Sequence, residues 1–310
     1  MQRPARILAV SGCVMFLLST ATGRTEEVQP ATDTALVPLP ETTSEKSVQF
    51  SQQPAEVGDR VAQQIDFAMH LNTSILQSDQ IAHQQSVSQE HRQQRLVEVL
   101  EVAQGNVRQA RVTFPQSRGT SPDGENPDKE VVEPVEGKAY LVTRQGKQLL
   151  VTDVNGAIPP RAEFEIVYTS MQSLGLPNPL AAFLLGRTIH VGETIEVPQS
   201  IASEMLGFGA ELGEVKQFQL RLKEPATYEG SPCAVFDAKI LVAGGADQPL
   251  RVGVVGPVVI LTESCRTVVT ELTGPLSVDA VEHTRGGSYQ YQGSGEVRVA
   301  VHAHYRSRSQ

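Results

Sequence analysis

The sequence has too few basic residues for a protein that binds nucleic acid. Its 310 residues include 26 lysines and arginines against 35 aspartates and glutamates, which gives a formal net charge of −9 at pH 7. Binding to phosphate groups requires a surface rich in lysine and arginine, and attraction to an anionic membrane surface requires the same. The acidic composition therefore argues against both kinds of partner.

Long hydrophobic runs are also lacking, because the apolar run near the N-terminus covers only residues 7–18 and is too short to span a bilayer comfortably. Arg3 and Arg6 precede this run, and Ala21 and Gly23 follow it. A positive start, a short apolar stretch and small residues at a cleavage position are typical of a secretory signal peptide. We therefore predict a signal peptide at residues 1–23, whose removal changes the formal charge from −9 to −11.

Two alternatives for this N-terminal segment stay open. It could remain as a membrane anchor, or Cys13 could carry a lipid as in bacterial lipoproteins. The second alternative fits less well because the apolar run continues past Cys13 to Leu18, whereas a lipidated cysteine should end that run. We expect an exported protein, located in the periplasm, in the cell envelope or outside the cell.

Cysteine is scarce, with Cys233 and Cys265 the two that follow the predicted signal peptide. An even number of cysteines in an exported chain favours a disulfide, so we predict one between Cys233 and Cys265. Two buried free thiols are the alternative. Neither cysteine has a neighbouring histidine or a nucleophile motif, so a catalytic thiol is not expected.

Catalytic and cofactor motifs are absent too. The sequence contains no nucleophile elbow, no zinc-binding His-Glu pattern, no phosphate loop and no dinucleotide fingerprint. The glycine-rich segment 207–213 has a spacing one residue too long for a dinucleotide turn, and no βαβ unit surrounds it. We therefore expect no cofactor, no metal and no enzymatic activity.

Two pairs of ionisable residues require a closer look. His302 and His304 lie two apart, so they share one face of a strand and could bind zinc or copper if a third ligand joined them. That face also carries arginines, and a solvated strand face is the favoured interpretation. His190 and His283 are candidates for the third metal ligand only because no better one is present. Glu193 and Glu196 are three apart, point to opposite strand faces and should not converge for acid–base work.

Two segments have the composition of unfolded chain. Residues 24–56 are rich in Thr, Pro, Glu, Gln and Ser, and such a segment buries too little surface to offset its ordering entropy. We predict a disordered linker there. Residues 115–134 contain prolines, glycines and clustered acids, which predicts a flexible exposed loop within one domain that spans residues 57–310.

The folded part is predicted to be mainly β. Apolar residues alternate six times between Ile65 and Ile75, which favours a strand over a long helix for this stretch, although the helix stays open for residues 57–114. Hairpins are predicted around Gly105-Asn106 and around Gly146, a strand over residues 164–169, and further strands to the C-terminus. Short-spaced strands without βαβ alternation predict a large antiparallel sheet.

Two short helices are predicted in the middle of the chain. Asn178 and Pro179 precede the apolar run of residues 180–185, and Gly186 follows it, as expected for a capped helix. Ser200 begins a second short helix that ends before Gly207. A helix that is apolar on nearly every side must be covered, so Leu180, Phe183 and Leu184 either fill the core or line a cavity that holds an apolar ligand.

The segment "LLGRTIHVGETIEVP", with the later strand "FQLRLKEPATYEGSPCAVFDAKI", resembles a loosely defined group of exported bacterial β proteins. These share a V-x-V-G-[DE]-T turn and look like the periplasmic lipoprotein-carrier architecture. Ile195 stands where members of the group have a tryptophan. The resemblance implies a strongly curved antiparallel sheet, an incomplete barrel with helices in its concavity, over residues 57–310 in outline. It also implies a role in binding or scaffolding.

From these observations we expect a non-enzymatic envelope or secreted protein that binds an apolar or lipidic ligand between sheet and helices. The alternative is a structural or protein-interaction module that binds a partner through a sheet edge or through the acidic loop at residues 115–134.

Overall fold

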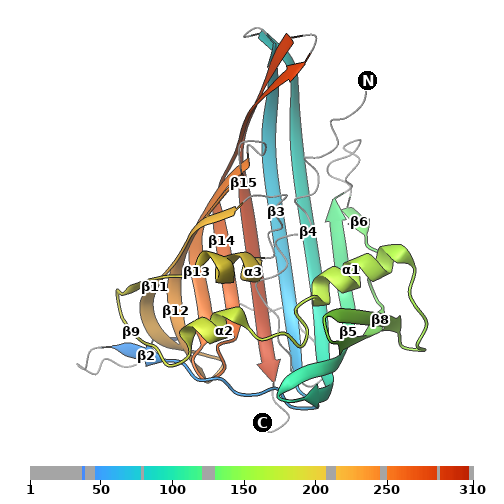
Figure 1. The fold of residues 1–310 in the computed structure, drawn as a ribbon, viewed down its shortest axis with the longest axis vertical. Helices are drawn as coiled ribbons and strands as arrows, with labels where there is room; N and C mark the ends of the chain where they lie inside the picture. Colours follow the sequence, from blue (N-terminus) through green and yellow to red (C-terminus); the bar gives the residue numbers. More distant parts are fainter. Residues whose placement is uncertain are drawn as a thin grey trace.

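The computed structural model describes residues 37–38, 46–77, 80–120, 130–206, 214–244, 250–284 and 287–306. The predicted signal peptide and most of the predicted linker lie outside these residues. The described residues form a thirteen-stranded antiparallel sheet that does not close into a barrel, a separate two-stranded sheet and three helices (Figure 1). The predicted fold class is confirmed, except that three helices are present where two were expected.

Eleven strands of the main sheet follow the order β1-β11-β12-β13-β14-β15-β3-β4-β5-β7-β8, while β10 pairs with β11 and β6 pairs with β5. The strands in the N-terminal part are β1 (Val37–Pro38), β3 (Arg60–Gln77), β4 (Gln80–Ala103), β5 (Asn106–Thr120), β6 (Glu130–Val132), β7 (Ala139–Gln145) and β8 (Gln148–Asp153). Those in the C-terminal part are β10 (Thr194–Glu196), β11 (Glu214–Tyr228), β12 (Ser231–Ala243), β13 (Leu250–Leu261), β14 (Thr267–Thr284) and β15 (Gly287–Arg306).

The N-terminal half of the sheet is built from the segment whose secondary structure was ambiguous in the sequence. Residues 60–77, 80–103 and 106–120 are strands, so the period-two interpretation is confirmed and the long helix is wrong. Val61, Ile65, Phe67, Met69 and Leu71 are all buried on one face of β3. Burial of that single face fixes the pairing register, because a shift by one residue would expose the whole apolar set.

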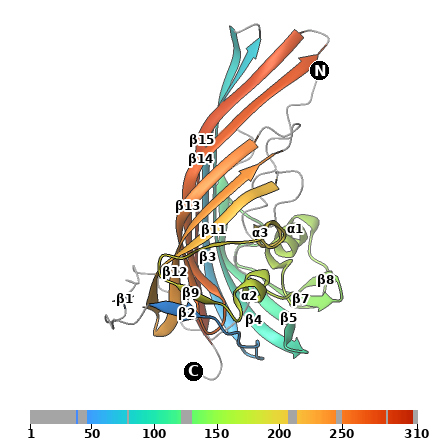
Figure 2. The ribbon, with the colours of Figure 1, turned by 60° about the vertical axis from the view of Figure 1, so that its left-hand side comes forward.

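The C-terminal half of the sheet ends beside β3, the first long strand of the chain. Strands β11 to β15 follow one another as antiparallel neighbours, and β15 then pairs with β3 from Tyr289 opposite Gln77 to Arg306 opposite Arg60. The middle of the sheet is therefore formed by its first and last long strands. The strands β3, β4, β14 and β15 continue well beyond the helices and form a projecting tip (Figures 1 and 2).

The three helices lie in the connection between the two halves and cover one face of the twisted sheet (Figure 2). They are α1 (Arg161–Met171), α2 (Pro179–Leu184) and α3 (Gln199–Leu206). We call the covered side the helix face and the opposite side the outer face. None of the described helices has the length and apolar character needed to cross a membrane.

Helix α1 corrects the strand that was predicted over residues 164–169. Its half-buried and buried residues Phe164, Val167, Tyr168 and Met171 follow the i, i+3, i+4, i+7 spacing of one helix face. The six-residue window used for the strand was too short to reveal this spacing. The other two helices are confirmed: Asn178 caps α2, and α3 begins at Gln199, one residue before the predicted start.

Two segments predicted to be unstructured contribute strands, among them β1, which lies inside the predicted linker at residues 24–56 and pairs with β11. Residues 47–49 of the predicted linker form β2 (Ser47–Gln49), which pairs with β9 (Thr188–His190), and both Val48 and Phe50 are buried. Phe50 stacks on Phe236 with ring centroids 6.3 Å apart. In the predicted loop, residues 115–120 extend β5 and residues 130–132 form β6, while residues 121–129 lie outside the described residues. Val48 and Phe50 therefore bury apolar surface in a segment whose overall composition predicted disorder.

Candidate functional site

The apolar helix α2 is fixed at its N-terminus by Asn178. The side-chain oxygen of Asn178 accepts hydrogen bonds from the backbone N–H groups of Leu180 (3.0 Å) and Ala181 (3.4 Å), which satisfies donors that the first helical turn leaves unpaired. Its Nδ2 donates to the carbonyl oxygen of Cys265 at 3.1 Å. One side chain therefore starts the helix and ties it to the turn between β13 and β14.

The three residues proposed as ligand contacts, Leu180, Phe183 and Leu184, are buried with exposed fractions of 2%, 7% and 0%. They belong to the main apolar cluster on the helix face. The guanidinium of Arg187 lies 4.1 Å from the centre of the Phe183 ring, so part of this ring is covered by a cation. Contact between these side chains and a ligand stays a prediction.

The helix face also contains a buried arginine. Arg95 of β4 is 2% exposed; its Nε donates to the side-chain oxygen of Gln63 and its Nη1 to the carbonyl oxygen of Ser170, both at 2.5 Å. Burial lowers the pKa of the Arg95 guanidinium to about 10, against a smaller opposite effect of Tyr305. This cation connects two sheet strands to the C-terminal end of α1, where the helix dipole favours positive charge.

Two polar atoms on the helix face are buried without a hydrogen-bond partner among the described residues, Gln93 Oε1 and Thr270 Oγ1. Thr270 pairs with Val301, Val301 with Ile65, and Ile65 with Gln93, so all four residues lie in one row across the sheet. With strands spaced about 4.8 Å apart, the two polar residues are separated by about 14 Å along this row. Unsatisfied buried polar atoms are uncommon and call for a partner such as water or a ligand.

A second polar group lies beside Gln93. The Gln93 amide donates to Ser117 Oγ (3.1 Å), and Ser117 Oγ donates to Glu133 Oε2 (2.5 Å). His91 Nε2 is 3.2 Å from the same carboxylate oxygen. Burial alone would raise the pKa of Glu133, but the hydrogen bonds and charge of His91 and the bond from Ser117 outweigh it and lower that pKa. The group fixes β6 and its following turn to β4 and β5.

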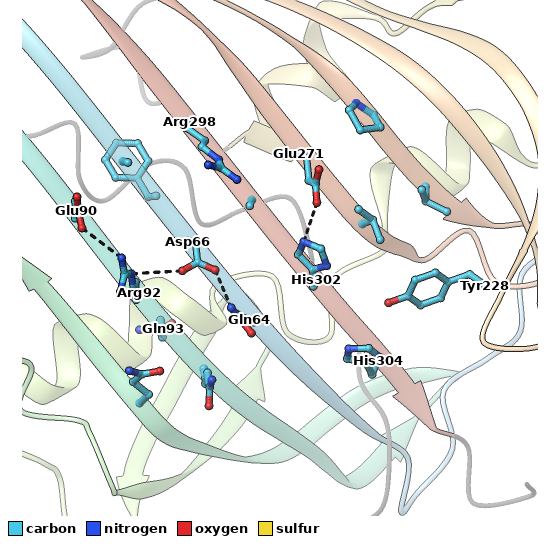
Figure 3. Close-up of a pocket in the computed structure, with 18 residues that line it drawn as sticks. Gln64, Asp66, Glu90, Arg92, Gln93, Tyr228, Glu271, Arg298, His302 and His304 are labelled. Atoms are coloured by element: carbon cyan, nitrogen blue, oxygen red, sulfur yellow. Dashed lines mark hydrogen bonds and ion pairs between the residues drawn. The ribbon is translucent and has the colours of Figure 1, made fainter. Parts of the chain in front are cut away.

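The outer face carries a different kind of feature, a polar hollow of about 810 Å³ that lies across the middle of the sheet (Figure 3). A second hollow of about 640 Å³ adjoins it and shares Ala68, Glu90, Pro257, Glu271 and Arg298 with it. Side chains of β3, β4, β14 and β15 project into the first hollow from alternating positions, so its residues are all even-numbered on β15 and mostly even-numbered on β3 and β4, where Phe67 and Gln93 also line it.

Most charges in the outer hollow are paired. Arg92 lies 3.8 Å from Asp66 and 3.6 Å from Glu90, and His302 lies 3.1 Å from Glu271 (Figure 3). Arg298 is exposed and forms no ion pair with a described residue. The hollow therefore presents a mixed-charge surface with one unpaired guanidinium, which suits a polar partner better than an apolar one.

The histidine pair of β15 lines this hollow, yet the two rings have separate partners. His302 pairs with Glu271, whereas His304 Nδ1 lies 2.7 Å from Glu229 Oε1 and its ring stacks on Tyr228 with centroids 6.1 Å apart. Among the described residues no group of three His, Cys, Asp or Glu side chains could hold a metal ion. Both rings lie on the same face of β15, as their spacing of two residues predicts. The side chain of His283 lies outside the described residues.

The remaining polar candidates do not converge. Glu193 accepts a hydrogen bond from the backbone N–H of His190 (2.9 Å), and Glu196 accepts one from the side chain of Gln219 (2.6 Å). Both glutamates and His190 are exposed. The sequence interpretation of Glu193 and Glu196 as separate, solvated residues is confirmed.

The predicted disulfide is wrong in this structure, because Cys233 and Cys265 are both free and buried. Cys233 belongs to a small apolar cluster formed by β11, β12, β13 and β14 on the outer face, and Cys265 belongs to the main cluster on the helix face. The two thiols are therefore packed into different parts of the core. Burial raises the pKa of each thiol to about 11.

Three polar residues of the helix face were not predicted from the sequence: Gln63, Gln93 and Arg95. A pattern that could have indicated them is present, because Gln93 and Arg95 are in phase with the buried Val97 and Val99 of the same strand. The outer hollow has no comparable pattern, since it depends on side chains brought together by five or more strands.

No protein-family model matches the sequence, and the search of curated proteins gave no match. Similar solved structures include lipovitellin, from a study of its lipid–protein interactions, at 9% identity and a TM-score of 0.40; the match covers 82% of this chain and 26% of the lipovitellin chain. A DUF1329 family protein from Desulfovibrio piger matches at 8% identity and a TM-score of 0.15, over 78% of this chain and 85% of that chain. A LolA superfamily protein from Nitrosomonas europaea matches at 10% identity and a TM-score of 0.15, over 78% and 86%.

A DUF1329 family protein and a LolA superfamily protein are therefore among the solved structures to which this chain is similar. At these TM-scores the similarity supports no inference about function, which must come from the residues themselves. This chain spans about a quarter of the lipovitellin chain that it matches.

Proposed function

We propose that this protein is an exported, non-enzymatic binding protein that holds an apolar or lipidic ligand between the helix face of its sheet and the helices. The proposal rests on one observation, which is that three short helices cover the wide apolar helix face of the sheet. Its apolar residues run across β3, β11, β12, β14 and β15, whereas the helices that cover it have only 11, 6 and 8 residues and all belong to one connection.

A cover of this kind suits the entry and release of a ligand. Movement of the helices away from the sheet need not break the pairings of its long strands, because the hydrogen bonds of β3 to β5 and of β11 to β15 are made within the sheet, while β10, between α2 and α3, stays paired with β11. Apolar surface exposed by such a movement would favour refilling by an apolar molecule. Gln93 Oε1 and Thr270 Oγ1 on the same face have no hydrogen-bond partner within the described part of the chain and offer contacts for a polar end of the ligand.

Native mass spectrometry of protein purified from its own envelope tests the proposal directly. We expect a bound species that is heavier than the chain by the mass of a lipid and that is removed by organic extraction. Protein that is reproducibly free of ligand would contradict the proposal.

A second test uses the absence of tryptophan from the sequence. Phe183→Trp places the sole indole next to the predicted ligand, while Val255→Trp places it on the outer face, where Val255 is 53% exposed. A brominated long-chain fatty acid should quench the fluorescence of the Phe183→Trp variant and leave that of the Val255→Trp control unchanged. Equal quenching of both variants would indicate nonspecific surface binding and count against the proposal.

The alternative is a protein-interaction module of the cell envelope. The mixed-charge hollow on the outer face favours it, because the charged side chains there, with Arg298 in no ion pair among the described residues, can bind the polar surface of a protein. Co-purification of one protein partner, lost on Arg298→Glu and retained on the exposed control Arg161→Glu, would support this alternative.

A further inference from the structure

Strand β4 extends beyond its neighbour β5 at the projecting tip. β3 pairs with β4 from Gln80 to Glu98, but β5 pairs with β4 only from His91 onward. Residues 80–89 of β4 therefore have a partner strand on one side, and no other described strand pairs with their free side. Figures 1 and 2 show this part of β4 at the margin of the tip.

Among the described residues, this free edge has the extra residue Ala82 but otherwise lacks the features that usually protect such edges. Residues 80–89 read QIAHQQSVSQ and contain no Lys, Arg, Asp, Glu, Pro or Gly. Natural sheets commonly protect an edge with charged residues, proline, bulges or a covering segment. The opposite edge follows this rule, because β1 and β10 both pair with β11.

One hydrogen bond shows which backbone groups point outward. The N–H of Glu90 donates to Thr120 Oγ1 of β5 at 3.0 Å, so the N–H and C=O groups of Glu90 point away from β3. The direction of the backbone N–H and C=O groups alternates along a strand, so the groups of Ser88, Ser86 and Gln84 also point away from β3. The alternation ends at Ala82, an extra residue between the pairs His83–Ile75 and Ile81–Leu76.

We propose that this edge pairs with the same edge of a second copy of the chain, antiparallel and about a twofold axis at Ser86. The three outward residues are symmetric about Ser86, so Ser86 would pair with Ser86 of the second copy, and Gln84 with Ser88 of the second copy, in both directions. Every outward donor then meets an outward acceptor. No charged side chain lies in residues 80–89, so this pairing creates no like-charge contact. The pairing joins two tips into one continuous sheet.

The state of association of the full chain, measured by sedimentation across a dilution series, tests this pairing. We expect a reversible dimer for the wild-type chain and a monomer for Ser86→Pro, which removes an outward N–H but no hydrogen bond to β3. Ser86→Lys and Ser86→Glu should each be monomeric, because identical charges would meet at the axis. An equimolar mixture of these two variants should restore a dimer.

Ser74→Lys is the matched control. Ser74 pairs with Gln84 and lies on β3, an interior strand of the same tip, so the added charge does not reach the edge. This variant should dimerise like the wild-type chain, and at dilutions where the wild-type chain is monomeric all variants should have its thermal midpoint. A wild-type chain that stays monomeric at every concentration would overturn the proposal. So would a dimer that survives Ser86→Pro and Ser86→Lys, or a loss of the dimer in Ser74→Lys.

Discussion

Arg95 of strand β4 donates a hydrogen bond of 2.5 Å to the carbonyl oxygen of Ser170, in the last turn of helix α1. The same guanidinium donates to Gln63 on the neighbouring strand. A buried cation is costly unless its donors are satisfied, and here its acceptors come from the sheet and from the helix that covers it. The position of α1 on the helix face therefore depends on Arg95.

Replacement of Arg95 by methionine keeps the length of the side chain and removes the donors. The Ser170 carbonyl and the Gln63 amide each lose the hydrogen bond from this guanidinium, so we expect the free energy of unfolding to fall by about 2–4 kcal/mol. Amide hydrogen exchange in residues 161–171 should accelerate more than exchange in β12. Unchanged protection of α1 would show that the arginine does not hold the helix.

The same substitution at two glutamines should have different effects. Gln63→Met removes an acceptor of Arg95 and should cost about 1–3 kcal/mol. Gln93→Met removes the hydrogen bond to Ser117 Oγ, but it also removes a buried Oε1 that has no partner among the described residues, and because the two effects oppose each other we expect a change within about 1 kcal/mol of zero. Urea denaturation of the two variants measures the difference. A larger loss for Gln93→Met would indicate that its oxygen is satisfied by a bound molecule.

Free thiols at Cys233 and Cys265 predict slow chemical modification of the native protein. Burial raises the pKa of each thiol to about 11, so the reactive thiolate is scarce at neutral pH. We expect both cysteines to resist iodoacetamide in the folded chain and to react completely after unfolding without reductant. Peptide mapping measures how far each cysteine is modified. If the two cysteine peptides stay unmodified and linked after unfolding, the protein contains a disulfide instead.

The strands were predictable from sequence where one face is buried, as between Ile65 and Ile75 on β3, because burial of one face imposes a period of two. Helix α1 was not predicted, since Phe164 and Met171 reveal their common face only over two turns. The disulfide was predicted from cysteine number and export, and neither indicates that Cys233 and Cys265 occupy different clusters.

The candidate site was predictable only in its apolar part. Leu180 and Phe183 were identified because an apolar run with a cap indicates a buried helix. Arg95 was missed because a polar residue in an alternating strand is normally assigned to the solvent, and only its phase relative to Val97 places it inside. The outer hollow brings Asp66 and His302 together from distant parts of the chain, which no local pattern encodes.

The ion pair between Glu229 and His304 should make a small contribution to stability that depends on pH. The hydrogen bond between Glu229 and His304 is the main reason why the pKa of Glu229 lies below its ordinary value of 4.5. A lowered carboxyl pKa stabilises the folded state above the unfolded value, and this stabilisation is lost as the pH falls through the folded value. Because Glu229 is partly exposed, we expect only about 0.5 kcal/mol.

Glu229→Gln tests this expectation. Its free energy of unfolding should lie slightly below that of the wild-type chain at about pH 6 and should equal it at about pH 3. Glu263→Gln is the control, since Glu263 is exposed and its side chain has no partner among the described residues. A difference that grows toward acid would contradict the assigned direction.

The contact between the first and last long strands should tolerate no added methyl group at Gly295. A Cβ atom there would overlap the carbonyl oxygen of His70 on β3, and backbone cannot yield as a flexible side chain can. Gly295→Ala must therefore shift β15 relative to β3, and we expect the free energy of unfolding to fall by about 1–3 kcal/mol.

Gly253→Ala is the matched control on β13, because its new Cβ would meet only Leu241 Cδ1 at 3.8 Å. That variant should be neutral or gain about 0.5 kcal/mol, since alanine restricts the unfolded chain more than glycine does. Urea denaturation measures both values, and equal stability of the two variants would show that β15 and β3 can separate at this point without cost.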